Sequence, residues 1–566
     1  MLRIFLILNI LLILQNCTSL PQQQTPSAAF DNTIHTQNFP NDLLWYQGNT
    51  GRDSLEGISL ARTYLESLQG RKVDTTIVAV IDMSVDTNHP LLSNFIWTNK
   101  SEARNNKDDD ANGYIDDLHG WNFIGNENGT SIIYSNYEYT RILRKYDPLF
   151  STIDSVSIND SLIDTYAIYQ RARKKHTERT AYAQNIKRQV DDLMQQFKEA
   201  VQVIRVTYPK FTYGVEAVDS LRKQTHSDTV QKKLDFLHTL TSRKLTENYL
   251  HDYEEETNAM INIMLNKSFD ERTVLNQDSE NFEDQYYGNN KVDAHSIKLD
   301  HGTKVAGIIA ADRSKSNKGI KGITNSVKIM PLCISPYGDE HDKDLVLAIK
   351  YAVDKGARII NISSGKEFSL YKDRVDEAIK YAERHDVLIV KSAGNDGYNL
   401  ENEMCYNYPN DIGTDGKEIV QNFIRVGASA KKADKGLKLS YSNYGKNRVD
   451  IFAPGEDIYT LSPNREEQFT TFGATSAATA IVSGVAALLR SYYPNLTASQ
   501  VKQILMDSVT TYDVDVEIKE KNEKGEKITK MIPFSQLSKS GGIVNAYNAL
   551  KLAEEITSNS SNARRQ

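Results

Sequence analysis

The sequence has few cysteines, little net charge and no long apolar run, and each shortage excludes a class of protein. Three cysteines in 566 residues cannot form the framework of a small disulfide-stapled scaffold. Lys and Arg (67) nearly balance Asp and Glu (74), so the net charge of -7 gives no electrostatic footprint for nucleic acid. No stretch reaches the roughly 20 apolar residues of a membrane span, which excludes a multi-span membrane protein. The 39% hydrophobic content predicts a globular fold with a large core.

The chain begins with a segment typical of exported proteins. Met1-Leu2-Arg3 precedes a mostly apolar run over Ile4–Leu14, which fits the core of a signal peptide covering residues 1–16. The run ends in Leu14-Gln15-Asn16-Cys17, which resembles a bacterial lipobox and implies that Cys17 becomes a lipidated first residue. Residues 17–42, rich in Gln, Thr, Ser and Pro, then form a flexible tether. We expect a lipid anchor that holds the protein to a membrane of the bacterial cell envelope, at the periplasmic or outer-membrane face. Because Gln15 and Asn16 differ from the small residues usual before such a cysteine, simple secretion is the alternative.

Two cysteines, Cys333 and Cys405, lie within the folded part of the chain. The sequence does not decide whether they pair. The interpretation we favour is two buried free thiols, since unpaired cysteine behaves as a small apolar side chain.

Short β-branched runs alternate with helical stretches from about residue 75 onward. Thr75–Ile81 has the composition of a buried parallel strand, and helical patterns cover Leu345–Lys355 and Val375–Arg384. Further strand-like runs occur at residues 326–330, 357–362, 387–390 and 423–426. This alternation predicts an α/β fold with three layers, in which a mostly parallel sheet lies between helices. We expect this domain to comprise residues 43–130 and 285–555.

A helical insertion interrupts this pattern over residues 131–284. One face of a long helix is marked by apolar residues at spacings of three and four, namely Ile186, Val190, Leu193, Phe197, Val201 and Ile204. A second helical stretch over residues 215–266 follows Tyr208-Pro209, so we expect a long antiparallel hairpin. The insertion is interpreted as a helical decoration packed on the domain, with a folding or gating role or a surface for a protein partner as alternatives. Residues 556–566 are expected to be a disordered tail.

Three distant segments each place a reactive side chain at the end of a predicted element. Asp82 closes an apolar strand, His301 opens a small-residue helix, and Ser476 opens a helix that is apolar nearly all round. Taken singly, each is explained as well by a turn, cap or core role. Together they occur in the order Asp, His, Ser, which is the order of subtilisin.

The motifs around these residues resemble those of the subtilisin-like serine peptidases, the subtilase family. The matching segments are Val78-Ala79-Val80-Ile81-Asp82, His301-Gly302-Thr303 with Val305-Ala306-Gly307, and Thr475-Ser476. The resemblance covers about residues 75–125 and 290–555 and implies a subtilisin-like fold with a catalytic triad. Ser476 would attack the peptide carbonyl, His301 would transfer its proton, and Asp82 would orient the imidazole.

Two further segments match the family's substrate-handling motifs. Ser392-Ala393-Gly394-Asn395-Asp396-Gly397 resembles the oxyanion-hole segment, which implies that the Asn395 amide donates to the developing oxyanion. Asn361-Ile362-Ser363-Ser364-Gly365 resembles the segment whose backbone pairs with an extended polypeptide substrate, and implies substrate binding by Ser363, Ser364 and Gly365. A glycine-flanked turn and an ordinary strand end are the respective structural alternatives.

The sequence departs from the family pattern beside two of the catalytic residues. Met83-Ser84 replaces the usual Ser or Thr and Gly after the aspartate, and Ala474 replaces a glycine before Thr475. Ala477 and Ala480 stand where Met and Pro are usual. A Cβ at residue 474 is unfavourable if the backbone there has a positive φ. A catalytically weak or inactive binding protein is therefore the alternative to an active peptidase.

An acidic loop before the predicted insertion has the spacing of a calcium site. Oxygen-bearing side chains alternate over residues 108–117, with Gly113 at the sixth position, although the bidentate Glu of an EF-hand is absent. The expected ligands of a structural Ca²⁺ are the side chains of Asp108, Asp110, Asn112 and Asp116 and the carbonyl of Tyr114. An exposed acidic turn without metal is the alternative.

The sequence therefore predicts an envelope-anchored serine endopeptidase that hydrolyses polypeptides through an acyl-enzyme. The stretch between Cys17 and Asp82 is short for a tether plus an inhibitory prodomain, so activation by propeptide removal is not evident. Besides the inactive binding protein, a hydrolase of esters or small amides would use the same site. Cleavage specificity and the physiological substrate do not follow from the residues.

Overall fold

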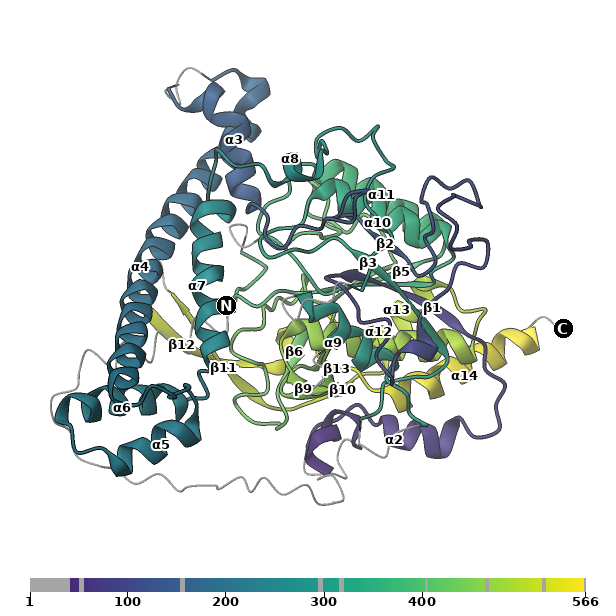
Figure 1. Ribbon diagram of the computed structural model, residues 1–566. Coiled ribbons are helices and arrows are strands. Elements are labelled where there is room, and N and C mark those ends of the chain that lie inside the picture. The colour runs from purple at the N-terminus through teal and green to yellow at the C-terminus, as the bar shows by residue number, and fades with distance from the viewer. Residues whose placement is uncertain are drawn as a thin grey trace. The chain divides into compact units, whose positions relative to one another are not determined.

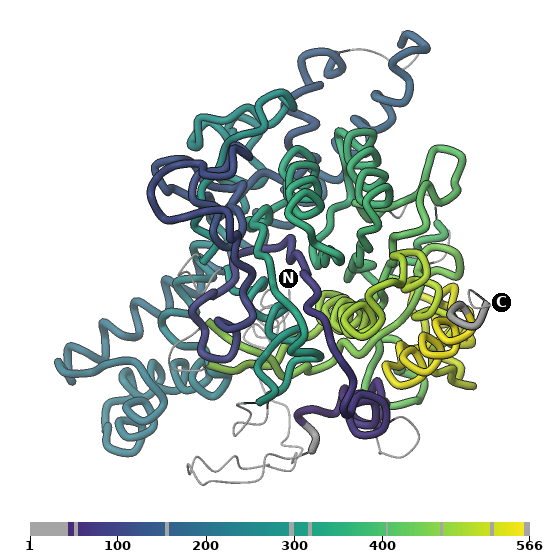
Figure 2. The backbone as a smooth tube through the Cα atoms, turned by 90° about the vertical axis from the view of Figure 1, so that its right-hand side faces the viewer, coloured from purple at the N-terminus to yellow at the C-terminus, as the bar shows by residue number. Residues whose placement is uncertain are grey.

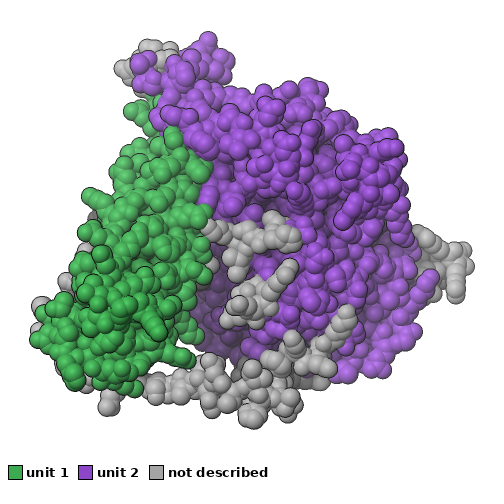
Figure 3. Space-filling view, viewed as in Figure 1, with its two compact units in different colours: residues 1–38, 163–266 green, residues 39–162, 267–566 purple. Residues whose placement is uncertain are grey.

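The computed structural model describes residues 41–563, apart from residues 50–54, 153–157, 294–298, 315–319, 403–405, 464–467 and 522–525. The chain divides into two compact units, coloured separately in Figure 3. The described part of the smaller unit is residues 163–266, and the larger unit holds the rest. The signal peptide, Cys17, nearly all of the predicted tether and Cys405 lie outside the described residues. None of the helices in the described ranges is long and apolar enough to cross a membrane.

A nine-stranded sheet forms the centre of the larger unit (Figure 1). Its strand order is β10-β13-β7-β6-β5-β4-β1-β3-β2. The strands are β1 (Thr76–Asp82), β2 (Trp121–Asn122), β3 (Val327–Cys333), β4 (Ile359–Ile362), β5 (Leu388–Ser392), β6 (Phe423–Ser429), β7 (Ile451–Pro454), β10 (Thr510–Thr511) and β13 (Gly542–Ile543). Neighbouring strands pair in parallel except β10 with β13. The five strands predicted from β-branched runs are β1, β3, β4, β5 and β6, so the predicted mostly parallel sheet is confirmed.

Helices cover both faces of this sheet, as the alternation of strand β1 shows. Val78 and Val80 pack in one cluster with α9 (His301–Ala310) and α12 (Thr475–Tyr492). Ala79 and Ile81 point to the other face, into a cluster with α10 (Asp342–Asp354) and α11 (Lys372–Arg384). Figure 2 shows α10 and α11 side by side. The strands are buried on both sides, which explains their continuous apolar runs.

Smaller elements complete the larger unit. They are α2 (Leu60–Arg62), α3 (Glu138–Phe150), α8 (Glu271–Leu275), α13 (Ala498–Asp507), α14 (Ala546–Ala563), and the hairpins β8 (Ile458–Leu461) with β9 (Phe469–Phe472) and β11 (Asp515–Lys521) with β12 (Lys527–Pro533). The predicted disordered tail is wrong for residues 556–563, because α14 continues through them. Ala549, Leu550 and Ala553 bury one side of that helix in the core, and this packing supports its polar end.

The smaller unit is built on one long helix, α4 (Ile163–Thr207). All six apolar residues of the predicted stripe are buried, and the helix packs against α6 (Asp228–Thr241) and α7 (Glu247–Ala259). The predicted hairpin is wrong in its second arm, which breaks into α5 (Val215–Gln224), α6 and α7. The breaks follow local capping, because the side chains of Ser227 and Thr246 accept hydrogen bonds from the backbone N–H groups of Val230 and Tyr249.

The smaller unit also covers fewer residues than the predicted insertion of residues 131–284. Residues 131–162 and 267–284 belong to the larger unit, where buried ion pairs hold them. Glu138 pairs with Lys366 at 3.3 Å, and Arg272 pairs with Asp344 of α10 at side chains that are 2% and 1% exposed. Tyr287 also donates its hydroxyl to Asp344.

Candidate active site

Asp82 is held at the carboxyl end of β1, an edge at which parallel sheets form their sites. Its side chain is 1% exposed, and Oδ1 accepts a hydrogen bond of 2.7 Å from the backbone N–H of Met83. Parallel pairing with β3 and β4 on both sides fixes the strand. The carboxylate therefore has one orientation, toward the start of α9.

His301 meets this carboxylate from the first turn of α9. Its Nδ1 lies 2.6 Å from Oδ1 of Asp82, so the imidazole donates its Nδ1 proton and leaves Nε2 as the reactive nitrogen. The close approach depends on Gly302, because a Cβ there would lie 2.6 Å from the carbonyl oxygens of Met83 and Ser84. This lack of space for a Cβ explains why glycine occupies the middle of the His301-Gly302-Thr303 motif.

The surroundings of His301 shift its pKa upward from 6.5. Burial lowers the pKa by penalising the imidazolium, but the negative charge of Asp82 and its hydrogen bond outweigh that effect. The ring also packs edge-on against Phe472 at 5.1 Å between centroids. The neutral form of this imidazole is the one that can act as a general base.

Ser476 is the second residue of α12 and is 5% exposed. Its hydroxyl donates a hydrogen bond of 2.9 Å to the carbonyl of Ser363, and no hydrogen bond joins it to His301. Ala474, two residues before Ser476, has φ 85° and ψ 178°, a backbone region that strongly favours glycine. The sequence-based concern about a Cβ at this position is therefore confirmed.

Asn395 contacts the same turn of α12 from the loop after β5. Its Oδ1 accepts hydrogen bonds from the backbone N–H and the hydroxyl of Thr475, at 3.0 and 2.9 Å. The carbonyl oxygen is thereby fixed, and the amide Nδ2 donates to no residue in the described part of the chain. In the first turn of α12, the N–H groups of Ala477 and Ala478 donate to the carbonyl of Ala474, and that of Ser476 has no acceptor among the described residues. The Asn395 amide and the Ser476 N–H suit an incoming negative oxygen.

The predicted substrate segment contacts Ser476 through Ser363. Ser363 accepts the Ser476 hydroxyl and donates its own hydroxyl to the Ser476 carbonyl at 3.3 Å. The Ser364 hydroxyl is buried and has no hydrogen-bond partner within the described residues. Gly365 is exposed, and a Cβ there would lie 2.7 Å from Nζ of Lys391.

Lys391 is a residue that the sequence analysis missed. It is fully buried, donates to the carbonyl of Ser392 at 2.6 Å and to Asn407 at 3.0 Å, and has its pKa lowered to about 7 by burial. The sequence signal that could have identified Lys391 is its position within an apolar strand, three residues before a glycine.

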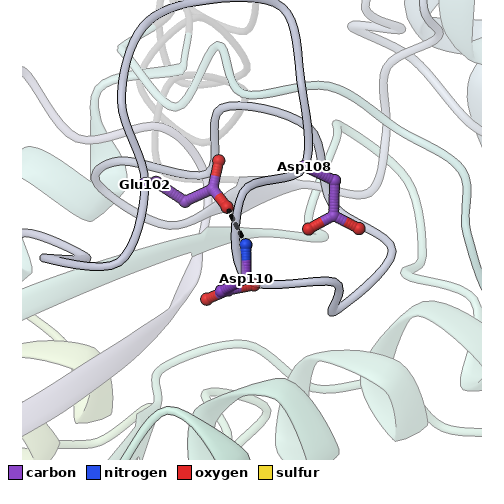
Figure 4. Close-up of side chains that lie close together, drawn as sticks. All are labelled: Glu102, Asp108 and Asp110. Carbon is purple, nitrogen blue, oxygen red and sulfur yellow. Dashed lines mark hydrogen bonds between the residues drawn. The ribbon is translucent and has the colours of Figure 1, made fainter.

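The predicted calcium loop brings together a different set of oxygens. Glu102, Asp108 and Asp110 offer carboxylate oxygens within 4.8 Å of one another (Figure 4). Asn112 and Asp116 are engaged elsewhere, since Asn112 Oδ1 accepts from the Tyr114 N–H and Asp116 accepts from residues 105 and 106. The predicted ligands Asp108 and Asp110 thus lie together, and Asp116 is not part of this group of carboxylates.

Glu102 is the member of this cluster that the spacing argument missed. Its carboxylate accepts the backbone N–H groups of Asp109, Asp110 and Asp116, which folds the loop around it. It lies outside the alternating run, so no local pattern identified it. Oδ1 of Asp110 is buried and has no hydrogen-bond partner within the described residues, which fits a cation ligand.

Cys333 ends β3 as a buried free thiol. Burial raises its pKa, which keeps the thiol protonated and unreactive. The other half of the prediction, Cys405, lies outside the described residues.

Comparison with known proteins identifies the family of this fold and site. The model of the subtilase family, Peptidase S8, matches residues 74–527. The chain belongs to the subtilase family. The match includes Asp82, His301, Asn395 and Ser476 and extends through the helical insertion.

The subtilase relatives are proteases from several organisms. The chain is 36% identical over 235 residues to the cell wall-associated protease of Bacillus subtilis (strain 168), covering 40% of this chain and 24% of that protein. It is 33% identical over 216 residues to the major intracellular serine protease of the same strain, covering 38% and 61%. The self-cleaved protease domain of PatA aligns with 28% identity over 45% of this chain and 83% of that one, at a TM-score of 0.33. These curated relatives are matched over less than two thirds of their length.

Proposed function

We propose that this subtilase is a serine endopeptidase that cleaves polypeptides through an acyl-enzyme on Ser476. The observation that carries the proposal is the 2.6 Å hydrogen bond between His301 and Asp82, formed beside the helix that carries Ser476 as its second residue. The hydrogen bond fixes the tautomer in which Nε2 can accept a proton. Asn395, held by Thr475, supplies the amide for the oxyanion.

The reaction begins with rotation of the Ser476 hydroxyl away from the Ser363 carbonyl toward His301. Oγ then attacks the substrate carbonyl carbon, its proton passes to Nε2 of His301, and the imidazolium is stabilised by Asp82. Collapse of the tetrahedral intermediate breaks the C–N bond, and His301 returns the proton to the leaving amine. Water repeats the same steps on the ester, which releases the carboxylate product and restores Ser476.

Hydrolysis of an unfolded protein substrate tests this function. The full chain should release peptides from denatured casein, and Ser476→Ala should lower the rate by at least about 10³-fold. Equal rates for the two proteins would contradict the proposal and favour the inactive binding protein. Parallel peptide and ester libraries separate an endopeptidase from a hydrolase of esters or small amides.

We also propose that Glu102, Asp108 and Asp110 hold a structural Ca²⁺ when it is bound. Three carboxylates supply the hard oxygen ligands that Ca²⁺ prefers, and Lys355, which pairs with Asp110, offsets only part of their negative charge. Addition of Ca²⁺ to chelator-treated protein should raise Tm, and Asp108→Asn should abolish the rise. An equal rise in both proteins would place the ion elsewhere.

Envelope anchoring at Cys17 remains our proposal, with secretion as the alternative. It is supported by the segment Leu14-Gln15-Asn16-Cys17 after an apolar run. Metabolic labelling with an alkyne fatty acid should mark the full chain, and Cys17→Ser should remove the label. Unlabelled protein in the medium would support secretion.

A further inference from the structure

A basic cavity of about 550 Å³ opens next to the candidate active site. One wall is the loop after β6, residues 430–440, and another is strand β11, whose Glu517 N–H donates to the carbonyl of Lys435 at 2.8 Å. The lysines that line it are Lys431, Lys432, Lys435, Lys438 and Lys519, and the acidic residues are Asp434, Glu456 and Glu517. Positive side chains therefore outnumber negative ones.

Most of this positive charge has no close acidic partner of its own. Lys432 is exposed and forms no ion pair with any described residue. Lys435 and Lys519 share one carboxylate, that of Glu517, at 3.8 and 3.0 Å, and both side chains are about three quarters exposed. Such exposed pairs are weak, so an incoming anion can redirect these lysines at little cost.

Lys438 adds a buried positive charge beneath the cavity. It is 4% exposed, and among the described residues Nζ donates to the backbone carbonyls of Leu439, Ser440 and Ser442. Burial lowers its pKa to about 7, and no carboxylate of the described residues forms an ion pair with it. A carboxylate bound in the cavity would supply that missing negative charge.

The cavity touches both segments that carry the candidate catalytic groups. Gly397, two residues after Asn395, lines it and donates its N–H to the carbonyl of Tyr441 at 2.7 Å. On the other side, Glu456 follows Gly455, whose carbonyl accepts the N–H of Ala474 at 2.8 Å. The cavity thus adjoins the turn that presents Ser476.

The order of strands places the cavity across the Asn395 segment from the predicted substrate segment. The predicted substrate segment, Ser363–Gly365, follows β4, and Asn395 follows β5. The cavity loop follows β6, on the other side of β5. An extended substrate that pairs with the β4 segment before its scissile bond therefore continues toward the cavity after that bond.

We propose that this cavity binds carboxylates of the substrate on the leaving-group side of the scissile bond, with Lys432, Lys435 and Lys519 as the contacting cations. Lys438 provides positive potential below them and acts as a positioning residue. The proposal rests on the proposed function of Ser476. It names acidic stretches of unfolded polypeptide as the preferred substrate class.

A binding experiment on the Ser476→Ala full chain tests the cavity separately from hydrolysis. The probes are two peptides with a dye at the C-terminus, alanine followed by three glutamates and alanine followed by three glutamines. We expect the glutamate peptide to bind about three- to tenfold more tightly at low salt, with the preference reduced in 0.5 M NaCl.

Charge reversal identifies the lysines that are responsible. Lys432→Glu with Lys519→Glu should abolish the preference, whereas Lys417→Glu, an exposed lysine outside the cavity, should retain it. Equal affinities for the two peptides, no binding of either, or equal loss in the Lys417 variant would overturn the proposal. Failure of the wild-type chain to hydrolyse any peptide would count against the role of Ser476 instead, because binding is measured without turnover.

Discussion

Nδ1 of His301 and Oδ1 of Asp82 are joined by a 2.6 Å hydrogen bond between residues 219 positions apart. The bond ties the end of β1 to the first turn of α9. It also links the charge of the buried carboxylate to the protonation of the imidazole, which gives the account a measurable pH dependence.

The rate of Ser476 acylation should rise with pH to a midpoint above 6.5. His301 must be neutral to accept the proton, and Asp82 raises its pKa. Asp82→Asn should shift the midpoint downward and lower the rate by roughly 10⁴-fold. His385→Gln, at an exposed histidine after α11, is the control and should leave the midpoint unchanged. An unchanged midpoint in Asp82→Asn would contradict the coupling.

The same pKa shift has a consequence for stability. Because the folded-state pKa of His301 is raised, its ion pair with Asp82 stabilises the protein below the unfolded pKa of about 6.5. This contribution is lost as the pH rises through the raised folded-state value. The free energies of unfolding of Ser476→Ala and of its Asp82→Asn derivative, measured in urea across that pH range, should differ less as the pH rises. The part of the difference that is due to charged His301 should vanish at the alkaline end.

Gly302→Ala should displace His301 and weaken catalysis. The new Cβ would approach two backbone carbonyl oxygens at 2.6 Å, which forces the start of α9 away from β1. A shift of about 1 Å in a catalytic group can cost about 10²-fold in rate. Gly214→Ala is the matched control, since a Cβ there meets nothing within 4 Å. Equal activity of the two variants would show that the close approach does not position the imidazole.

Ala474→Gly should stabilise the protein by about 1 kcal/mol. Relief of the positive φ, worth about 1–3 kcal/mol, exceeds the entropic cost of glycine in the unfolded chain. Ala477→Gly, three residues on and inside α12, should destabilise by about 1 kcal/mol. Urea unfolding measures both changes. The account of a strained turn would fail if the two substitutions had effects of the same sign.

Replacement of residues 163–266 by a short Gly/Ser linker should leave the larger unit folded. The buried stripe of α4 packs within the smaller unit, on α6 and α7. Deletion of residues 150–280 should cost about 3–5 kcal/mol more, because it removes Arg272 and leaves Asp344 buried without that cation. Arg272→Met reproduces this loss by one substitution. Equal stability of the two deletions would contradict the placement of the boundary.

Much of the sheet was predictable from the sequence because its strands are buried on both faces and read as continuous apolar runs. The long apolar stripe of α4 was also predictable, because its spacing of three and four residues persists over many turns. The division of the second arm into three helices was missed, although Ser227 and Thr246 are ordinary N-caps. A cap signals where a helix begins only when the surrounding chain permits a break.

The candidate site was predictable only where a local motif surrounds each residue. Asp82, His301, Asn395 and Ser476 each lie at an element end with a recognisable neighbourhood. Glu102 and the lysines of the cavity come from separate segments and meet only in the folded chain. Arg272 was missed for the same reason, because its partner Asp344 is 72 residues away and neither lies in a pattern.

Active-site labelling with a fluorophosphonate tests the central claim most directly. An activated serine displaces fluoride from the probe and forms a stable phosphonyl ester, so intact mass should show one adduct and peptide mapping should place it on Ser476. Ser476→Ala should carry no adduct, and His301→Ala should label far more slowly. Absence of labelling in the wild-type chain, or an adduct that persists in Ser476→Ala, would contradict the account.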